Sequence, residues 1–364
     1  MKDLLLTLEQ KVGQLFILGF QGYEPDADTR SLFDCIRPGG FLLYHRNIES
    51  FDQIYELTSR LREISTIAPF TAIDHEGGRV DRLKHIFMTM PSVAELASRG
   101  MATLRAGARI IAAELEASGI NLAFAPVVDL HMPGGIMANR CLASEPEAVA
   151  RFAGAFVEEL SKRGLFTCTK HFPGLGKATV DAHFSMPRID GTRRQLQQED
   201  AAPFVRLFGQ ADMIMISHAH YPGLGDDRPV PASLSARVVS GFLRKKLAYS
   251  GLTVTDDLTM GAVTSTGLTP DVFLRAFEAG NDLLLFTQTT PLAERAYRTI
   301  VAAARKSESL RRRVDESVNR ILALKGRIEF VPLRYRTHLK SRINRQIERL
   351  RKTVADAGAP VVTV

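Results

Sequence analysis

Acidic, basic and imidazole side chains follow five short apolar runs of this sequence, where predicted strands end. The set consists of Asp74, Arg82, Asp129, Arg140, Lys170, His171, Asp181, His183, His218, His220, Asp256 and Asp257. Neighbouring carboxylates and imidazoles can transfer protons or act as nucleophiles. Ionisable groups beside buried strands are costly unless they converge on a ligand or on each other. Their joint occurrence therefore predicts a single polar site.

Each of these residues also has a purely structural interpretation. A single Asp after a strand most often caps the next helix, and His218 and His220 can be hydrogen-bonded loop residues. A zinc site is disfavoured because no pair of histidines has the helical spacing of H-E-x-x-H. Cys168 lies within an apolar run, which indicates packing. We expect neither a metal nor an organic cofactor.

Eight short apolar runs alternate with amphipathic stretches along most of the chain. The runs are residues 14–20, 40–44, 70–74, 122–128, 165–170, 213–217, 252–255 and 283–286, and helical patterns cover 102–118, 145–163, 198–208, 236–248 and 270–279. Continuous hydrophobicity is typical of strands buried on both faces of a parallel sheet. The alternation predicts an α/β fold, a single (β/α)8 TIM-type barrel, with chemistry at the carboxyl ends of the strands. An open doubly wound sheet is the alternative, but no G-x-G-x-x-G follows the first strand.

The barrel pattern ends near Arg327, and Pro332 interrupts the chain shortly after it. We expect residues 1–327 to form the barrel domain and residues 328–364 to form a basic extension, with a helix at 334–357. Between Arg305 and Lys352 there are 16 Lys and Arg against 5 Asp and Glu, so the rest of the chain is net negative. Such a segment could bind nucleic acid or anionic lipid, but a solvated helix face is the favoured interpretation.

The overall composition is that of an ordinary globular protein. The chain has 364 residues, of which 45% are apolar and 24% charged, which excludes disorder for most of its length. Cys35, Cys141 and Cys168 fit neither a disulfide framework nor a metal-binding spacing. The N-terminal apolar run is too short for a signal peptide, and no run is long enough to span a membrane. We expect a cytoplasmic protein; the oligomeric state is left open.

Four ordered motifs resemble the family 3 glycoside hydrolases. They are DHEGGRVDR at 74–82, KHFPGLG at 170–176, DAH at 181–183 and TDDLTMGAV at 255–263. More narrowly, they look like the single-domain bacterial β-N-acetylglucosaminidases (β-hexosaminidases) of peptidoglycan recycling. The resemblance runs from about residue 11 to residue 324.

The resemblance implies a role for individual residues. Asp256 matches the family's catalytic nucleophile, and His183 with Asp181 matches its histidine–aspartate general acid/base on a mobile loop. Asp74 matches the carboxylate that binds hydroxyls of the terminal sugar, and the residues matching its other sugar contacts are Arg82, Arg140, Lys170 and His171. The chain departs from the usual pattern at Leu175, Lys177 and Ala182, which bears on substrate preference and loop behaviour.

These residues suit retaining glycoside hydrolysis, which needs a nucleophile and a proton donor on opposite sides of the anomeric carbon. Lys170 is expected to keep Asp256 ionised. An imidazole exchanges protons near neutral pH, and Asp181 would orient it. With no Trp, the chain lacks broad stacking platforms for long glycans. We therefore predict an exo-acting enzyme taking a small carbohydrate with a terminal N-acetylglucosamine.

Three alternatives stay open at this point. Within the same fold, the protein could be a β-glucosidase or an N-acetylglucosaminide phosphorylase, because a histidine acid places no second anion beside the nucleophile. It could also be a sugar-binding protein without turnover, as the departures at Leu175 and Ala182 suggest. Nucleic-acid binding through the basic segment is the least favoured.

Overall fold

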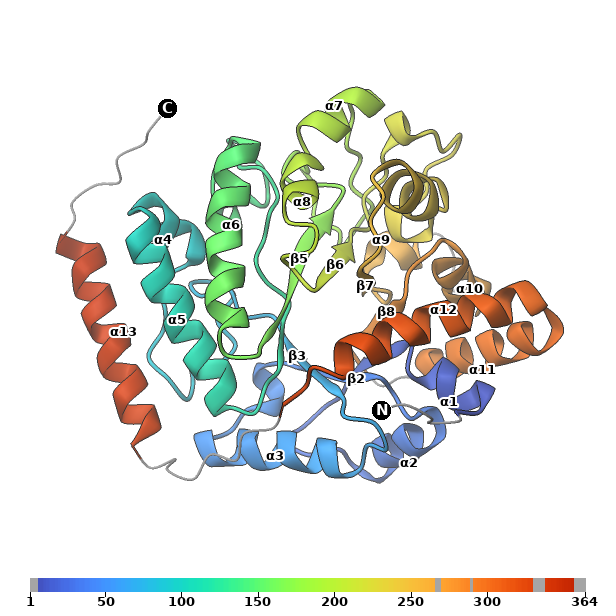
Figure 1. Ribbon diagram of the computed structural model, residues 1–364, viewed down its shortest axis with the longest axis horizontal. Coiled ribbons are helices and arrows are strands. Elements are labelled where there is room, and N and C mark those ends of the chain that lie inside the picture. Colours follow the sequence, from blue (N-terminus) through green and yellow to red (C-terminus); the bar gives the residue numbers. More distant parts are fainter. Residues whose placement is uncertain (1–5, 266–269, 289–290, 330–337, 357–364) are drawn as a thin grey trace.

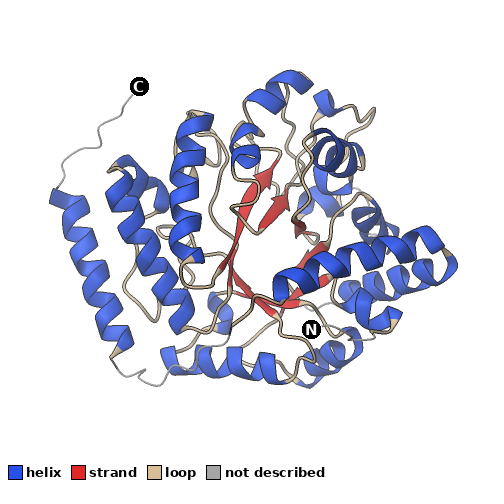
Figure 2. Ribbon diagram, viewed as in Figure 1, coloured by secondary structure: helices blue, strands red, loops and turns tan. Residues whose placement is uncertain are grey.

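Eight parallel strands close into a barrel at the centre of the molecule, and helices surround it (Figures 1 and 2). The computed structural model describes residues 6–265, 270–288, 291–329 and 338–356. The strands are β1 (Phe16–Gly19), β2 (Gly40–Leu43), β3 (Phe70–Ile73), β4 (Leu122–Ala123), β5 (Phe166–Phe172), β6 (Met213–Ile216), β7 (Leu252–Asp257) and β8 (Leu283–Phe286). Each strand pairs with the next, and β8 pairs with β1. The predicted (β/α)8 barrel is confirmed.

Burial explains why the strands read as continuous apolar runs. Every residue of β1, β2, β3, β6 and β8 is buried, because each strand has the barrel interior on one side and helices on the other. The fourth strand is shorter than predicted, since only Leu122–Ala123 forms a regular ladder. Pro126 has no N–H to donate, and pairing resumes as an isolated bridge between Val127 and Lys170.

Helices connect the strands and cover the outside of the barrel (Figure 2). They are α1 (Leu8–Gly13), α2 (Ala27–Ile36), α3 (Phe51–Glu63), α4 (Val93–Ser98), α5 (Met101–Ala117), α6 (Pro146–Ser161), α7 (Arg193–Gln198), α8 (Ala202–Arg206), α9 (Gly261–Thr264), α10 (Pro270–Glu278), α11 (Pro291–Lys306), α12 (Glu308–Lys325) and α13 (Leu339–Asp356). The helix predicted at 198–208 is shorter, since α7 ends at Gln198 and α8 covers only Ala202–Arg206. Pro203, in the first turn of α8, has no N–H with which to continue α7. The stretch predicted at 236–248 forms a π-helix, η5 (Arg237–Lys246).

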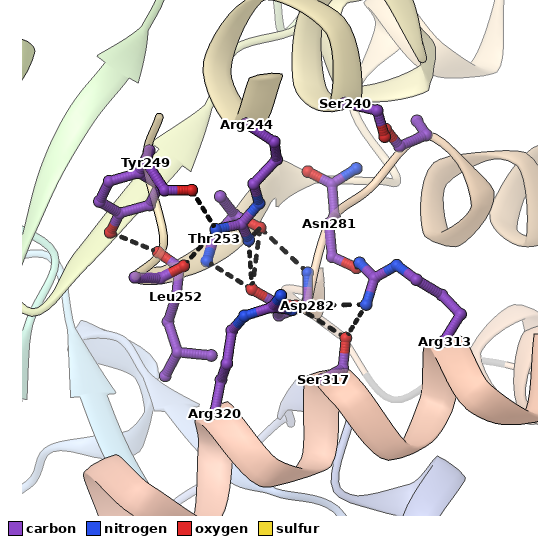
Figure 3. Close-up of polar contacts among 12 residues, drawn as sticks. Ser240, Arg244, Tyr249, Leu252, Thr253, Asn281, Asp282, Arg313, Ser317 and Arg320 are labelled. Atoms are coloured by element: carbon purple, nitrogen blue, oxygen red, sulfur yellow. Dashed lines mark hydrogen bonds and ion pairs between the residues drawn. The ribbon is translucent and has the colours of Figure 1, made fainter. Parts of the chain in front are cut away.

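The buried carboxylate of Asp282 connects several elements at the amino-terminal end of the barrel (Figure 3). Its Oδ2 accepts hydrogen bonds from Arg244 at 2.5 Å and from the Thr253 backbone N–H at 3.1 Å. Its Oδ1 accepts from Ser317 at 2.7 Å and from Arg320 at 3.0 Å, both on α12. Asp282 therefore joins η5, β7, β8 and α12 at the end of the barrel that usually serves stability.

Helix α13 packs against α5 at the edge of the molecule (Figure 1). Its buried residues recur at helical spacing and are Ile343, Ile347, Leu350 and Val354. Gly107 of α5 leaves room for Leu96 of α4, because an added Cβ would lie 2.2 Å from Leu96 Cδ1. The charged residues of α13 lie on its solvent face, as expected for the basic segment. No helix in the described ranges has the length and hydrophobicity to cross a membrane.

Candidate active site

A network of two carboxylates and two cations, in which Glu76 and Lys170 are buried, lies where β3 and β5 end. Lys170 Nζ lies 2.6 Å from Asp74 Oδ1 and 2.7 Å from Glu76 Oε1. Arg140 donates to both oxygens of Glu76 at 2.8 and 2.9 Å. Burial alone would raise the pKa of Glu76, but Lys170 and Arg140 outweigh it and hold that pKa well below its usual range. The network brings three predicted residues together through Glu76, to which the sequence assigned no role.

His171 is held by Asp129 beside this network. Its Nδ1 donates to Asp129 Oδ2 at 2.8 Å, and its backbone N–H donates to Asp129 Oδ1 at 3.2 Å. The Leu175 N–H also donates to Oδ1, at 2.6 Å. A fully buried carboxylate with three donors fixes both the imidazole and the loop after β5. Leu175, which departs from the usual family pattern, contributes its backbone to this arrangement.

Asp256 is positioned at the carboxyl end of β7 as a half-buried carboxylate. The Asp257 N–H donates to its Oδ1 at 2.8 Å. Burial raises the pKa of Asp256, but the imidazoles of His218 and His171 and the Asp257 N–H outweigh it, so the pKa lies below its ordinary value. Lys170 also lowers the pKa of Asp256, in the direction expected, but contributes less than these groups. Asp256 is thus anionic at neutral pH.

The adjacent Asp257 has a different, structural role. The Asp257 carboxylate accepts hydrogen bonds from the Thr259 N–H at 3.0 Å and the Thr259 hydroxyl at 2.7 Å. It also accepts from the Thr287 N–H at 3.2 Å and the Thr287 hydroxyl at 2.6 Å. These four bonds connect β7 to the end of β8 and occupy both oxygens of Asp257. Of the two consecutive acids, only Asp256 has its carboxylate available for a ligand.

His218, at the end of β6, is buried between β7 and its own loop. Its Nδ1 lies 2.7 Å from Ser233 Oγ, and its Nε2 lies 2.8 Å from the carbonyl oxygen of Asp257. Burial lowers the pKa of His218. His220 is also buried, and its Nδ1 accepts from the Val230 N–H at 3.3 Å. Both histidines therefore support loops, as their structural interpretation suggested, and His218 additionally lies near Asp256.

The loop after β5 carries the Asp181–His183 pair. His183 Nδ1 donates to Asp181 Oδ1 at 2.7 Å, and the His183 backbone N–H donates to the same oxygen at 2.9 Å. Burial raises the pKa of Asp181, but its bonds with His183 and the positive charge of Arg79 lower it overall. The imidazole is 70% exposed. With Nδ1 oriented by a carboxylate, Nε2 is the nitrogen that can transfer a proton to a ligand.

Backbone hydrogen bonds attach the same loop to the start of α9, which follows β7. The carbonyl oxygens of Ala182 and His183 accept from the N–H groups of Ala262 and Gly261 at 3.0 and 3.1 Å. A Cβ at Gly261 would lie 2.6 Å from the His183 oxygen, so a glycine is required for this close approach. The anchor therefore joins the loop to the segment that follows β7, five residues after Asp256.

Arg82 and Tyr44 lie together near the carboxylates. The Arg82 guanidinium carbon lies 5.1 Å from the centre of the Tyr44 ring, and that of Arg46 lies 4.5 Å from it. Burial raises the pKa of Tyr44 well above its ordinary value, and the negative charges of Asp74, Asp257 and Asp256 raise it further. Within the described residues, Arg82 Nε is buried without a hydrogen-bond partner. The sequence signalled Tyr44 only as the end of an apolar run.

Cys168 lies near these groups but is poorly suited to act as a nucleophile. Cys168 is fully buried within β5, and burial raises the pKa of its thiol, so the reactive thiolate is disfavoured. In the part of the chain that is described, no cluster of three or more His, Cys, Asp and Glu side chains could hold a metal ion. The arrangement instead combines an anionic carboxylate, a histidine–aspartate pair and a set of hydrogen-bonding charged groups.

The motifs that carry these residues belong to a known family. The model of the glycosyl hydrolase family 3 N-terminal domain matches residues 7–324 of this chain. The chain belongs to glycosyl hydrolase family 3. The predicted resemblance is confirmed, and the match covers the whole barrel.

Family 3 relatives with curated names are similar along most of this chain. A beta-hexosaminidase from Tolumonas auensis is 35% identical over 274 residues, which are 74% of this chain and 81% of that protein. One from Pseudomonas aeruginosa is 34% identical over 273 residues, with the same shares.

Two solved structures share the fold closely. A β-N-acetylglucosaminidase from Paenibacillus sp. str. FPU-7 superposes with a TM-score of 0.86 and 33% identity, covering 95% of this chain and 68% of that one. A β-N-acetylhexosaminidase from Beutenbergia cavernae gives a TM-score of 0.81 and 30% identity, covering 89% of this chain and 100% of that one.

Proposed function

We propose that this family 3 protein is a retaining exo-β-N-acetylglucosaminidase. It would release terminal β-linked N-acetylhexosamine from muropeptide or chitooligosaccharide fragments, acting in the cytoplasm in peptidoglycan recycling. The names of its relatives support the activity. The observation that carries the proposal is an available, ionised Asp256, together with a loop that carries the Asp181–His183 pair and is hydrogen-bonded to the segment after β7.

In the proposed reaction, Asp256 attacks the anomeric carbon while His183 Nε2 donates a proton to the glycosidic oxygen. The carbon–oxygen bond breaks, the leaving group departs as an alcohol, and a glycosyl ester forms on Asp256. His183, now neutral, accepts a proton from water, which attacks the same carbon and releases Asp256. Two inversions give net retention. Asp181 stabilises the imidazolium and keeps Nε2 directed at the substrate.

The charged network beside Asp256 supports the binding of one terminal sugar. We propose that Asp74, Arg82, Arg140, Lys170 and His171 contact its hydroxyl and acetamido groups. Charge-assisted hydrogen bonds are the strong ones, and Arg82 Nε has no partner among the described residues, which favours a ligand contact. Lys170 keeps Asp74 in place through its 2.6 Å ion pair. Residues 1–327 would form the catalytic unit and residues 328–364 the extension.

Hydrolysis of 4-nitrophenyl β-N-acetylglucosaminide tests this function. The wild-type protein should release nitrophenol, and Asp256→Ala should abolish release while leaving N-acetylglucosamine binding intact. Asp227→Ala is the matched control, because Asp227 is an exposed acid on another loop. A wild-type protein that binds the sugar without turnover, or an unchanged rate in Asp256→Ala, would refute the proposal. Proton NMR should show the β-anomer first; the α-anomer would exclude retention.

Phosphorolysis is the second candidate, because a histidine acid adds no permanent negative charge beside Asp256. An anionic acceptor such as phosphate would then meet less repulsion at the anomeric carbon. Repeating the assay with and without phosphate distinguishes the two reactions. Formation of N-acetylglucosamine 1-phosphate would identify a phosphorylase, and its absence at millimolar phosphate would leave hydrolysis.

A further inference from the structure

Exposed apolar side chains gather on the two loops that follow β4 and β5. Seven large apolar residues are exposed in the described part of the chain, and four of these lie on the two loops. The four are Met132, Ile136, Val180 and Phe184, here called the apolar rim. Phe184 is 84% exposed. Grouped exposed apolar residues mark binding surfaces, whereas single ones need no explanation.

Hydrogen bonds and close contacts join the two loops into one surface. The Ile136 N–H donates to the Ala178 carbonyl oxygen at 3.2 Å. A Cβ at Gly135 would lie 2.7 Å from the Gly176 oxygen, and one at Gly176 would lie 2.1 Å from the Leu130 oxygen. The backbones therefore pack too tightly for side chains at these glycines. These contacts hold the loop that carries Met132 and Ile136 against the start of the loop that carries Val180 and Phe184.

Phe184 has a fixed backbone and a free side chain. Its N–H donates to the backbone carbonyl oxygen of Asp181 at 3.0 Å. Its own carbonyl oxygen lies against Gly261, where an added Cβ would be 2.7 Å away. The ring follows His183 directly in the chain. Exposing a ring of this size costs free energy that binding to an apolar surface would recover.

We propose that the apolar rim binds the leaving group of the substrate, with Phe184 packing against the apolar face of a second pyranose ring. This inference rests on the proposed function, because His183 must reach the glycosidic oxygen and the leaving group must then lie beside residue 184. The charged network binds the terminal sugar through polar groups, whereas the rim offers only apolar contact. The enzyme would therefore prefer leaving groups with an apolar face over small alkyl groups.

Two substrates distinguish the contact between Phe184 and the leaving group from the cleavage reaction itself. Chitobiose has a second pyranose ring, whereas methyl β-N-acetylglucosaminide has the same terminal sugar and bond with only a methyl leaving group. Phe184→Ala should reduce kcat/KM for chitobiose roughly tenfold, mainly through KM. For the methyl glycoside the loss should be less than about twofold. Phe184→Tyr, which keeps the ring, should behave as wild type, and Val205→Ala on α8 is the control for removing an exposed apolar group.

Equal losses on both substrates would overturn the proposal, because they would indicate that Phe184 only positions His183. Unchanged values on both would overturn it as well. A wild-type protein that cleaves neither substrate would refute the proposed function itself. A wild-type protein that cleaves both, with a chitobiose preference unaffected by Phe184→Ala, would refute only the role of the rim.

Discussion

Replacing Asp282 with Asn tests whether the amino-terminal end of the barrel supplies stability independently of the site. Asp282 is fully buried, and three arginines lie within 3.4 Å of its oxygens, namely Arg244, Arg313 and Arg320 (Figure 3). Asparagine keeps the size but removes the negative charge and one acceptor. The half-buried guanidiniums would then face each other without a counter-ion.

Breaking one partner of a buried ion pair costs about 3–5 kcal/mol. Burial already lowers the pKa of Arg313, which shows that its charged form is poorly solvated. An unfolding entropy of about 2.1 cal/mol/K per residue amounts to roughly 0.7 kcal/mol/K for the barrel. Asp282→Asn should therefore lower Tm by about 4–7 °C. Hydrolysis at 25 °C should be unchanged, since the carboxyl ends of the strands are untouched.

Differential scanning calorimetry measures the shift, and Asp315→Asn is the matched control. Asp315 lies on the same helix, α12, and pairs with Lys11 at 2.7 Å, but its side chain is 43% exposed. Exposed pairs contribute at most about 1 kcal/mol. The reasoning is refuted if the two variants shift Tm equally, or if Asp282→Asn lowers kcat/KM at 25 °C.

Three further predictions concern buried cations and the proposed acid. Burial lowers the pKa of Lys325 to about 7 from 10.5, so the unfolded chain binds the proton more tightly between these values and stability rises with pH. Lys325→Met should therefore raise the free energy of unfolding, measured in urea, by roughly 1–3 kcal/mol at pH 7, a range that allows for the lost hydrogen bond to Gln14. The gain should be smaller at pH 10. A variant that is less stable than wild type at pH 7 would contradict this. Lys170→Met removes the cation that Asp74 and Glu76 share, and it should lower kcat/KM for the nitrophenyl glycoside at least about 100-fold. A loss of less than about tenfold would argue against a role for this ion-pair network in sugar binding. Asp181→Asn should lower kcat/KM by roughly 10²–10⁴ for the methyl glycoside but far less for a 2,4-dinitrophenyl leaving group, which needs no proton, and equal losses would exclude an acid role.

The barrel and the family were predictable because their signals are local. A strand buried on both faces must be apolar throughout, so eight such runs separated by helical patterns are visible without any knowledge of contacts. The motifs around Asp74, Lys170, His183 and Asp256 are likewise contiguous in the sequence. The carboxyl ends of parallel strands meet at one end of the barrel, which is why their polar residues could be assigned to one site.

The partners of these residues could not be predicted in the same way. Lys170 pairs with Asp74 and Glu76, which precede it by more than 90 residues, instead of acting mainly on Asp256. The contact of Tyr44 with Arg82 likewise depends on how the ends of β2 and β3 face each other. Sequence patterns show how residues are spaced along one strand, whereas the distances between residues of different strands follow from closure of the barrel.

The sequence by itself determined the eight buried strands, where the polar residues stand along the chain and which family the chain belongs to. Only the tertiary structure showed that Asp257 is occupied, because its four donors come from Thr259 and from Thr287, a residue on a different strand end. It also placed α13 on α5 and the loop after β4 against the loop that carries the Asp181–His183 pair. Hydrophobic periodicity is written in neighbouring residues, but the direction and protonation of a carboxylate depend on groups that folding brings together.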